Sequence, residues 1–126
     1  MFVQSSHNYR ILVVDDLADN LFLLQTFLEA EGFEVETADN GSQALNQVSA
    51  KPPDLVLLDV MLPDINGYEV TRQIRQNYSL HWIPIVLVTA HEQTYAKVGL
   101  DAGANDFIRK PIDLEELLRR IAAFLQ

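Results

Sequence analysis

The stretch LVLLDVMLPDINGYEV, residues 55–70, decides how the rest of the 126-residue chain is interpreted. It opens with four apolar residues, Leu55 to Leu58, which are followed directly by Asp59, and a helical pattern begins after a short loop at Gly67. A continuously apolar run is typical of a strand in a parallel sheet that is covered on both faces. The stretch is therefore expected to form a strand–loop–helix unit with a carboxylate at the end of its strand.

Units of the same kind recur on both sides of this stretch. Apolar runs lie at Ile11 to Val14 and Ile85 to Val88, whereas Glu34 to Ala38 alternates and Asp106 to Ile108 is short, as expected nearer the edges of a sheet. The helix candidates are a segment with Leu21, Leu24, Phe27 and Leu28 on one face before Gly32, Gly41 to Ala50 behind the N-cap Asn40, a helix from Gly67, a poorly patterned Glu92 to Ala102, and Leu114 to Leu125 behind the N-cap Asp113. Five alternating units predict an α/β fold with a five-stranded parallel sheet, doubly wound, and right-handed crossovers.

Composition excludes several functional classes. Apolar residues make up 48% of the chain, and there is no cysteine to form a disulfide or a thiolate metal site. The formal net charge of −9 argues against direct binding to nucleic acid, because phosphate neutralisation requires Lys and Arg. No apolar run is long enough to span a membrane and the N-terminus lacks a signal-peptide pattern, so a cytoplasmic protein is expected.

Chemically active side chains follow the predicted strands. The first strand ends in Asp15 and Asp16, the third in Asp59 and the fourth in Thr89, and Lys110 follows the fifth. Any one of these Asp residues could serve only as a helix cap. Three converging carboxylates, however, repel one another unless a cation intervenes, and an oxygen-only set suits Mg²⁺. Lys110 and Thr89 can bind phosphoryl oxygens, so the cluster predicts a site that holds a phosphoryl group on Asp59.

Four segments carry a resemblance to a known family. VVDD (13–16), LLDVMLPDINGYEV (57–70), VLVTA (86–90) and DFIRKP (106–111) resemble the signature blocks of bacterial response-regulator receiver domains. The resemblance covers Arg10 to Gln126, so residues 10–126 are expected to form the receiver domain and residues 1–9 a flexible N-terminal extension. It implies a flavodoxin-like sheet with strand order 2-1-3-4-5.

The resemblance also implies roles for individual residues. Asp59 would be the phosphoacceptor, and Asp15, Asp16, Asp59 and the backbone carbonyl of Met61 would hold Mg²⁺. Thr89 and Lys110 would assist phosphoryl transfer, Thr89 and Phe107 would form the conformational switch, and Pro111 would follow a cis peptide bond.

The implied partners follow from these roles. A sensor histidine kinase or a phosphotransfer protein would donate the phosphoryl group, and either a separate downstream protein or a covalently linked domain would receive the signal. Asp106, Glu116 and Arg120 match the charge pattern of a homodimer through the fourth helix, fifth strand and fifth helix. The basic residue that this pattern requires on the fourth helix falls at Ala96, with Lys97 one position later.

Two alternatives come from other functional classes. An aspartyl phosphatase acting on small molecules commonly has a second Asp two residues after its nucleophile, where this chain has Met61. A pseudo-receiver that binds partners without phosphate would lack some of the five site residues, and none is missing. A signalling switch that catalyses only its own phosphorylation and dephosphorylation, and is not a metabolic enzyme, is therefore expected.

Overall fold

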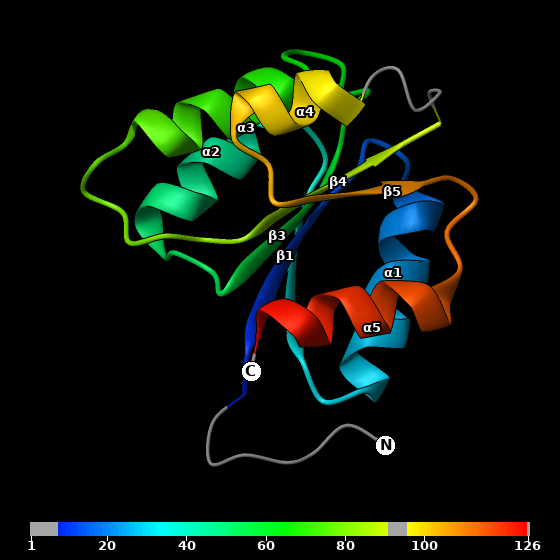
Figure 1. The fold of residues 1–126 in the computed structure, drawn as a ribbon. Coiled ribbons are helices and arrows are strands. Elements are labelled where there is room, and N and C mark those ends of the chain that lie inside the picture. The colour runs from blue at the N-terminus through cyan, green and yellow to red at the C-terminus, as the bar shows by residue number, and fades with distance from the viewer. Residues whose placement is uncertain (1–7, 91–95, 126) are drawn as a thin grey trace.

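The computed structural model describes residues 8–90 and 96–125, in which five strands alternate with five helices (Figure 1). The strands are β1 Arg10–Val14, β2 Glu34–Ala38, β3 Leu55–Asp59, β4 Ile85–Thr89 and β5 Asp106–Arg109. The helices are α1 Ala18–Ala30, α2 Gly41–Ala50, α3 Gly67–Gln76, α4 Ala96–Ala102 and α5 Leu114–Phe124. The predicted start of the fourth helix at Glu92 and the first seven residues of the predicted extension lie outside the described residues.

The sheet has the predicted topology. All its pairings are parallel and the strand order is β2-β1-β3-β4-β5, which confirms the doubly wound α/β fold. In Figure 1, α1 and α5 lie on one face of the sheet, whereas α2, α3 and α4 lie on the other. The register pairs Asp59 with Val88 and Thr89 with Arg109, so the polar ends of β3, β4 and β5 reach the same edge.

Alternation along the strands divides the apolar side chains between two cores. One core lies under α2, α3 and α4 and includes Leu12, Val14, Val56, Leu58 and Leu87. The other lies under α1 and α5 and includes Ile11, Val13, Leu57 and Val88. Because the side chains of the central strands are buried on both faces, these strands are apolar throughout.

The helix ends follow from local chemistry. The Asn40 side chain accepts a hydrogen bond from the Gln43 amide and so caps α2, and Asp113 caps α5 in the same way through two amides, as predicted. Gly32 follows α1 with φ 98°, a backbone conformation that few other residues adopt. The N-cap position of α1 is Leu17, whose side chain cannot accept a hydrogen bond.

Arg75, near the end of α3, joins the segments that flank β4. Its guanidinium donates to the carbonyls of Gly103 (2.9 Å) and Ile83 (2.7 Å) and to the side-chain oxygen of Asn105 (2.8 Å). It also lies 3.6 Å from the ring centroid of Trp82, an arrangement that favours a cation–π contact. Burial lowers the pKa of Arg75 to about 10, so the guanidinium remains charged at neutral pH. These contacts fix the amino ends of β4 and β5, opposite the edge where the polar strand ends meet.

Candidate functional site

Three carboxylates meet at the carboxyl edge of the sheet. One oxygen from each of Asp15, Asp16 and Asp59 lies within 4.8 Å of the others. Asp15 and Asp59 are each only 4% exposed, whereas Asp16 is open to solvent. The cluster therefore combines two desolvated carboxylates with one that remains hydrated.

Both oxygens of the Asp59 carboxylate are engaged. The backbone amide of Met61 donates to Oδ1 (3.0 Å), and the ammonium of Lys110 donates to Oδ2 (2.7 Å). Lys110 Nζ also lies 3.5 Å from an oxygen of Asp15, so one ammonium is shared by the two buried carboxylates. Lys110 precedes Pro111 through a cis peptide bond, as the family resemblance implied. The orientation of the Asp59 carboxylate is thus fixed by a backbone donor on one oxygen and a charged donor on the other.

Burial and charge act against each other at this pair. Burial raises the pKa of Asp59, and the nearby charge of Asp15 acts in the same direction, whereas the Lys110 ammonium and the Met61 amide oppose the rise. Burial alone would lower the pKa of Lys110, but the two carboxylates outweigh it, and the pKa of Lys110 is raised. Lys110 is therefore a permanent cation at neutral pH.

Asp15 is oriented by its own partners. Its oxygens accept hydrogen bonds from the Leu17 amide (2.9 Å) and from the side-chain amide of Asn20 (3.1 Å) in the first turn of α1. Sequence reasoning did not identify Asn20. The available signal was its place in the first turn of the helix that follows β1, five residues after Asp15.

The two residues that the resemblance assigns to the switch, Thr89 and Phe107, lie on β4 and β5. Thr89 ends β4 and is fully buried, and Phe107 is half-buried against the core beneath α2, α3 and α4. Phe107 pairs in register with Leu87. A Cβ at Gly99 of α4 would lie 2.6 Å from Leu87 Cδ1 and 3.7 Å from Phe107 Cδ2, so α4 packs closely over this pair. Strand alternation directs Thr89 toward the same face of the sheet as Phe107.

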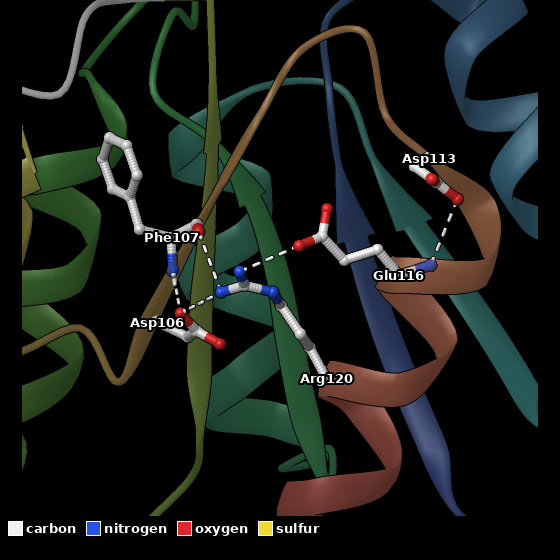
Figure 2. Close-up of polar contacts among 5 residues, drawn as sticks. All are labelled: Asp106, Phe107, Asp113, Glu116 and Arg120. Carbon is white, nitrogen blue, oxygen red and sulfur yellow. Dashed lines mark hydrogen bonds and ion pairs between the residues drawn. The ribbon is translucent and has the colours of Figure 1, made fainter.

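The predicted dimer charges contact one another within a single chain. Figure 2 shows Arg120 between Asp106 and Glu116, with the Phe107 ring directed away from it. Arg120 donates to Asp106 (2.6 Å), to Glu116 (3.0 Å) and to the Phe107 carbonyl (3.3 Å). This cluster ties the middle of α5 to the start of β5.

The donor set fits a hard divalent cation. Its oxygens come from carboxylates, and none of the three cluster members is a nitrogen or sulfur ligand, which is the selection expected for Mg²⁺ or Ca²⁺ rather than Zn²⁺. The exposed position of Asp16 leaves room for water ligands, which Mg²⁺ usually retains. Asp15, Asp16 and Asp59 could therefore hold such an ion beside Lys110.

Comparison with known proteins agrees with the fold. The family model described as response regulator receiver domain matches residues 11–122. The chain is 46% identical over 118 residues to the response regulator ArlR of Staphylococcus saprophyticus, covering 93% of this chain and 52% of that protein. It is 42% identical over 120 residues to the alkaline phosphatase synthesis transcriptional regulatory protein PhoP of Bacillus subtilis, covering 94% of this chain and 49% of that protein. A CheY-like receiver domain protein from Methanospirillum hungatei superposes with a TM-score of 0.86 at 30% identity, covering 94% of both chains.

These matches define the class of the molecule: the chain belongs to the response regulator receiver domain family. It is a phosphoacceptor receiver of two-component signalling, and its role is in signal transfer. The chain spans about half the length of the curated relatives it matches. Among the described residues, no helix is long and apolar enough to cross a membrane.

Proposed function

We propose that Asp59 accepts the phosphoryl group from a phosphohistidine on a sensor kinase or a phosphotransfer protein. A carboxylate oxygen of Asp59 attacks phosphorus, and the P–N bond breaks with its electron pair going to the imidazole. The observation that carries the proposal is the 2.7 Å contact between Lys110 and Asp59 inside a buried carboxylate cluster. The ammonium is positioned to stabilise charge on a phosphoryl oxygen as the new bond forms.

Hydrolysis of the aspartyl phosphate completes the cycle. Water attacks phosphorus, which returns the Asp59 carboxylate and releases inorganic phosphate. In this proposal the domain catalyses only its own phosphorylation and dephosphorylation. A small-molecule phosphatase is disfavoured, because the position two residues after Asp59 is Met61, whose side chain is 59% exposed and cannot transfer a proton.

Asp59 is tested directly by phosphorylation with acetyl phosphate and Mg²⁺. The unmodified domain should gain one phosphoryl group, and Asp59→Asn should gain none, because the amide is not a nucleophile. Asp101→Asn, which changes an exposed carboxylate on α4, should be labelled like the unmodified domain. Intact-protein mass spectrometry gives the answer, and a labelled Asp59→Asn domain would contradict the assignment.

The ion at the carboxylate cluster is Mg²⁺ in this proposal, held by Asp15, Asp16, Asp59 and the backbone carbonyl of Met61. When bound, Mg²⁺ neutralises charge on the phosphoryl oxygens. The carboxylates hold the ion in place, and the phosphoryl group shares Lys110 with the two carboxylates that it contacts.

Asp16→Asn should weaken Mg²⁺ binding by about tenfold or more, because affinity for hard cations depends on the number of charged ligands. The free energy of unfolding of the metal-free domain should rise, because the substitution removes one of three carboxylate charges that lie within 4.8 Å of one another. Asp19→Asn, which removes an exposed carboxylate in the first turn of α1, is the matched control. Isothermal titration calorimetry with MgCl₂ measures the Mg²⁺ affinities, and a denaturant titration measures the free energies of unfolding. Equal Mg²⁺ affinities for the two variants would argue against Asp16 as a ligand.

The kinase-contact surface is proposed to be the exposed side of α1 beside the site. Helix α1 and its N-cap carry an unusual amount of exposed apolar surface: Leu17 is 55% exposed, Phe22 72% and Leu23 54%. Leu23 also lines an open depression of about 550 Å³ that reaches Lys110 and Pro111. A donor helix seated here would bring its phosphohistidine to the edge that holds Asp59.

Leu23→Asp should reduce phosphoryl transfer from an autophosphorylated sensor kinase that phosphorylates the unmodified domain. A loss of about tenfold corresponds to about 1.4 kcal/mol of contact energy. Labelling by acetyl phosphate should be unchanged, because this small donor needs no docking surface. Leu100→Asp, at a residue equally exposed (53%) on α4, should keep kinase-dependent transfer. If both donors lost activity together in Leu23→Asp, the variant would have damaged the site and not a docking surface.

The output is proposed to run through α4, β5 and α5. Phosphorylation adds roughly −1.5 to −2 charge units at Asp59, and the buried Thr89 can move toward them. Phe107 can follow into the space that Thr89 leaves, and α4, which packs over Leu87 and Phe107 at Gly99, would shift with it. A homodimer on this face, a downstream protein, or a covalently linked domain could detect the shift. PhoP is named as a transcriptional regulator, which makes control of transcription a candidate output.

Thr89→Ala should still bind the phosphoryl mimic beryllofluoride but lose most of the amide chemical-shift changes in α4 and β5. Thr26→Ala, an exposed threonine on α1, should keep the full response. Sedimentation velocity of the same samples tests the dimer: beryllofluoride should raise the dimer fraction of the unmodified domain and not of Thr89→Ala. Shifts confined to α1 in the unmodified domain would show that the signal leaves through another surface.

A further inference from the structure

We propose that Asp64 is a positioning residue for the phosphorylation site, because it anchors the loop between β3 and α3 to the start of α2. The inference rests on the proposed function, since this loop carries Met61. The Asp64 carboxylate accepts hydrogen bonds from the amides of Gly41 and Ser42, each at 2.8 Å, across 23 and 22 residues of sequence. Each carboxylate oxygen takes one amide.

The contact is a tertiary anchor and not an ordinary helix cap. Helix α2 already has a local cap, because Asn40 accepts from the Gln43 amide (2.8 Å) and the Gln43 side chain accepts from the Asp39 amide (2.9 Å). The Gly41 and Ser42 amides are the remaining donors of the first turn, which attract a negative charge. The hydrogen bonds from these two amides hold the pKa of the Asp64 carboxyl below its usual range, so Asp64 is ionised at neutral pH.

Shape reinforces the anchor at the neighbouring residue. A Cβ on Gly41 would lie 2.4 Å from Ile65 Cγ1, so the Ile65 side chain packs directly on the helix start and would have to shift if residue 41 carried a Cβ. At the base of the loop, the Gly67 amide donates to the Val60 carbonyl (2.8 Å), and a Cβ on Gly67 would lie 2.6 Å from the Asp59 carbonyl oxygen. The loop is therefore held at its base and at its tip.

Met61 lies between these two fixed points. Its side chain is 59% exposed and does little to hold it in place, yet its amide donates to Asp59 Oδ1 at 3.0 Å. The orientation of the Asp59 carboxylate consequently depends on where the loop backbone is held. Asp64 supplies the polar part of the restraint between the loop and α2, beside the packing of Ile65 on Gly41.

The test uses Asp64→Ala, Asp64→Asn and, as a matched control, Asn40→Ala. Asn40→Ala removes the cap of the same helix without touching the loop, so it reports the cost of weakening α2 alone. Asp64→Ala should weaken Mg²⁺ binding by about tenfold, the lower end of the range for residues that orient metal ligands. Asp64→Asn retains one acceptor oxygen and should lie between Asp64→Ala and the unmodified domain. Asn40→Ala should lower the melting temperature and leave the Mg²⁺ affinity unchanged.

A second measurement needs no metal. Hydrogen exchange of the Met61 amide in the metal-free domain should accelerate in Asp64→Ala and not in Asn40→Ala. Unchanged Met61 exchange and Mg²⁺ affinity in Asp64→Ala, with a melting temperature lowered as in Asn40→Ala, would make Asp64 a structural residue only and overturn the proposal. Failure of the unmodified domain to bind Mg²⁺ or take up a phosphoryl group would instead contradict the proposed function.

Discussion

A single ammonium group shared by two buried carboxylates is the interaction on which the site depends. Oxygens of Asp15 and Asp59 lie within 4.8 Å of each other, and at an effective dielectric constant near 20 such charges repel by about 3 kcal/mol or more. Lys110 contacts both, at 3.5 and 2.7 Å, and offsets this repulsion. Lys110 also holds the two carboxylates in their present positions. An incoming anion must share the ammonium with them.

The strands, the residues at their carboxyl ends and the helix caps could be predicted from the sequence. Continuous apolar runs identified the central strands, and a parallel sheet brings its strand ends to one edge, so Asp15, Asp59 and Lys110 could be placed together from their positions in the chain alone. The caps Asn40 and Asp113 were predicted for the same reason, since a cap acts on amides two or three residues away. Strand order required the family resemblance.

Contacts between distant segments could not be predicted where the shared edge of the parallel strands does not bring the residues together. Asp64 and the start of α2 are 22 residues apart, and no periodicity relates them. No pattern in the sequence indicated that Arg75 would donate hydrogen bonds to both Gly103 and Asn105. Asp106, Glu116 and Arg120 were matched to a pattern between two protomers, but in one chain they satisfy one another, so a dimer would have to exchange or supplement these contacts.

The direction of α5 determines the distance between the end of the helix and Asp59. The helix runs back from the carboxyl edge toward the strand starts, and Leu125 shares a core with Ile11 and Leu55 (Figure 1). Strand β3 separates that end from Asp59 by about 13 Å, at roughly 3.3 Å per residue. A domain joined beyond Leu125 would start at the opposite edge of the sheet from Asp59, so it would have to reach back across the receiver to touch the phosphoryl group. Attachment at that end leaves the carboxylate cluster uncovered by the connection itself, so the same site can serve whatever is joined there.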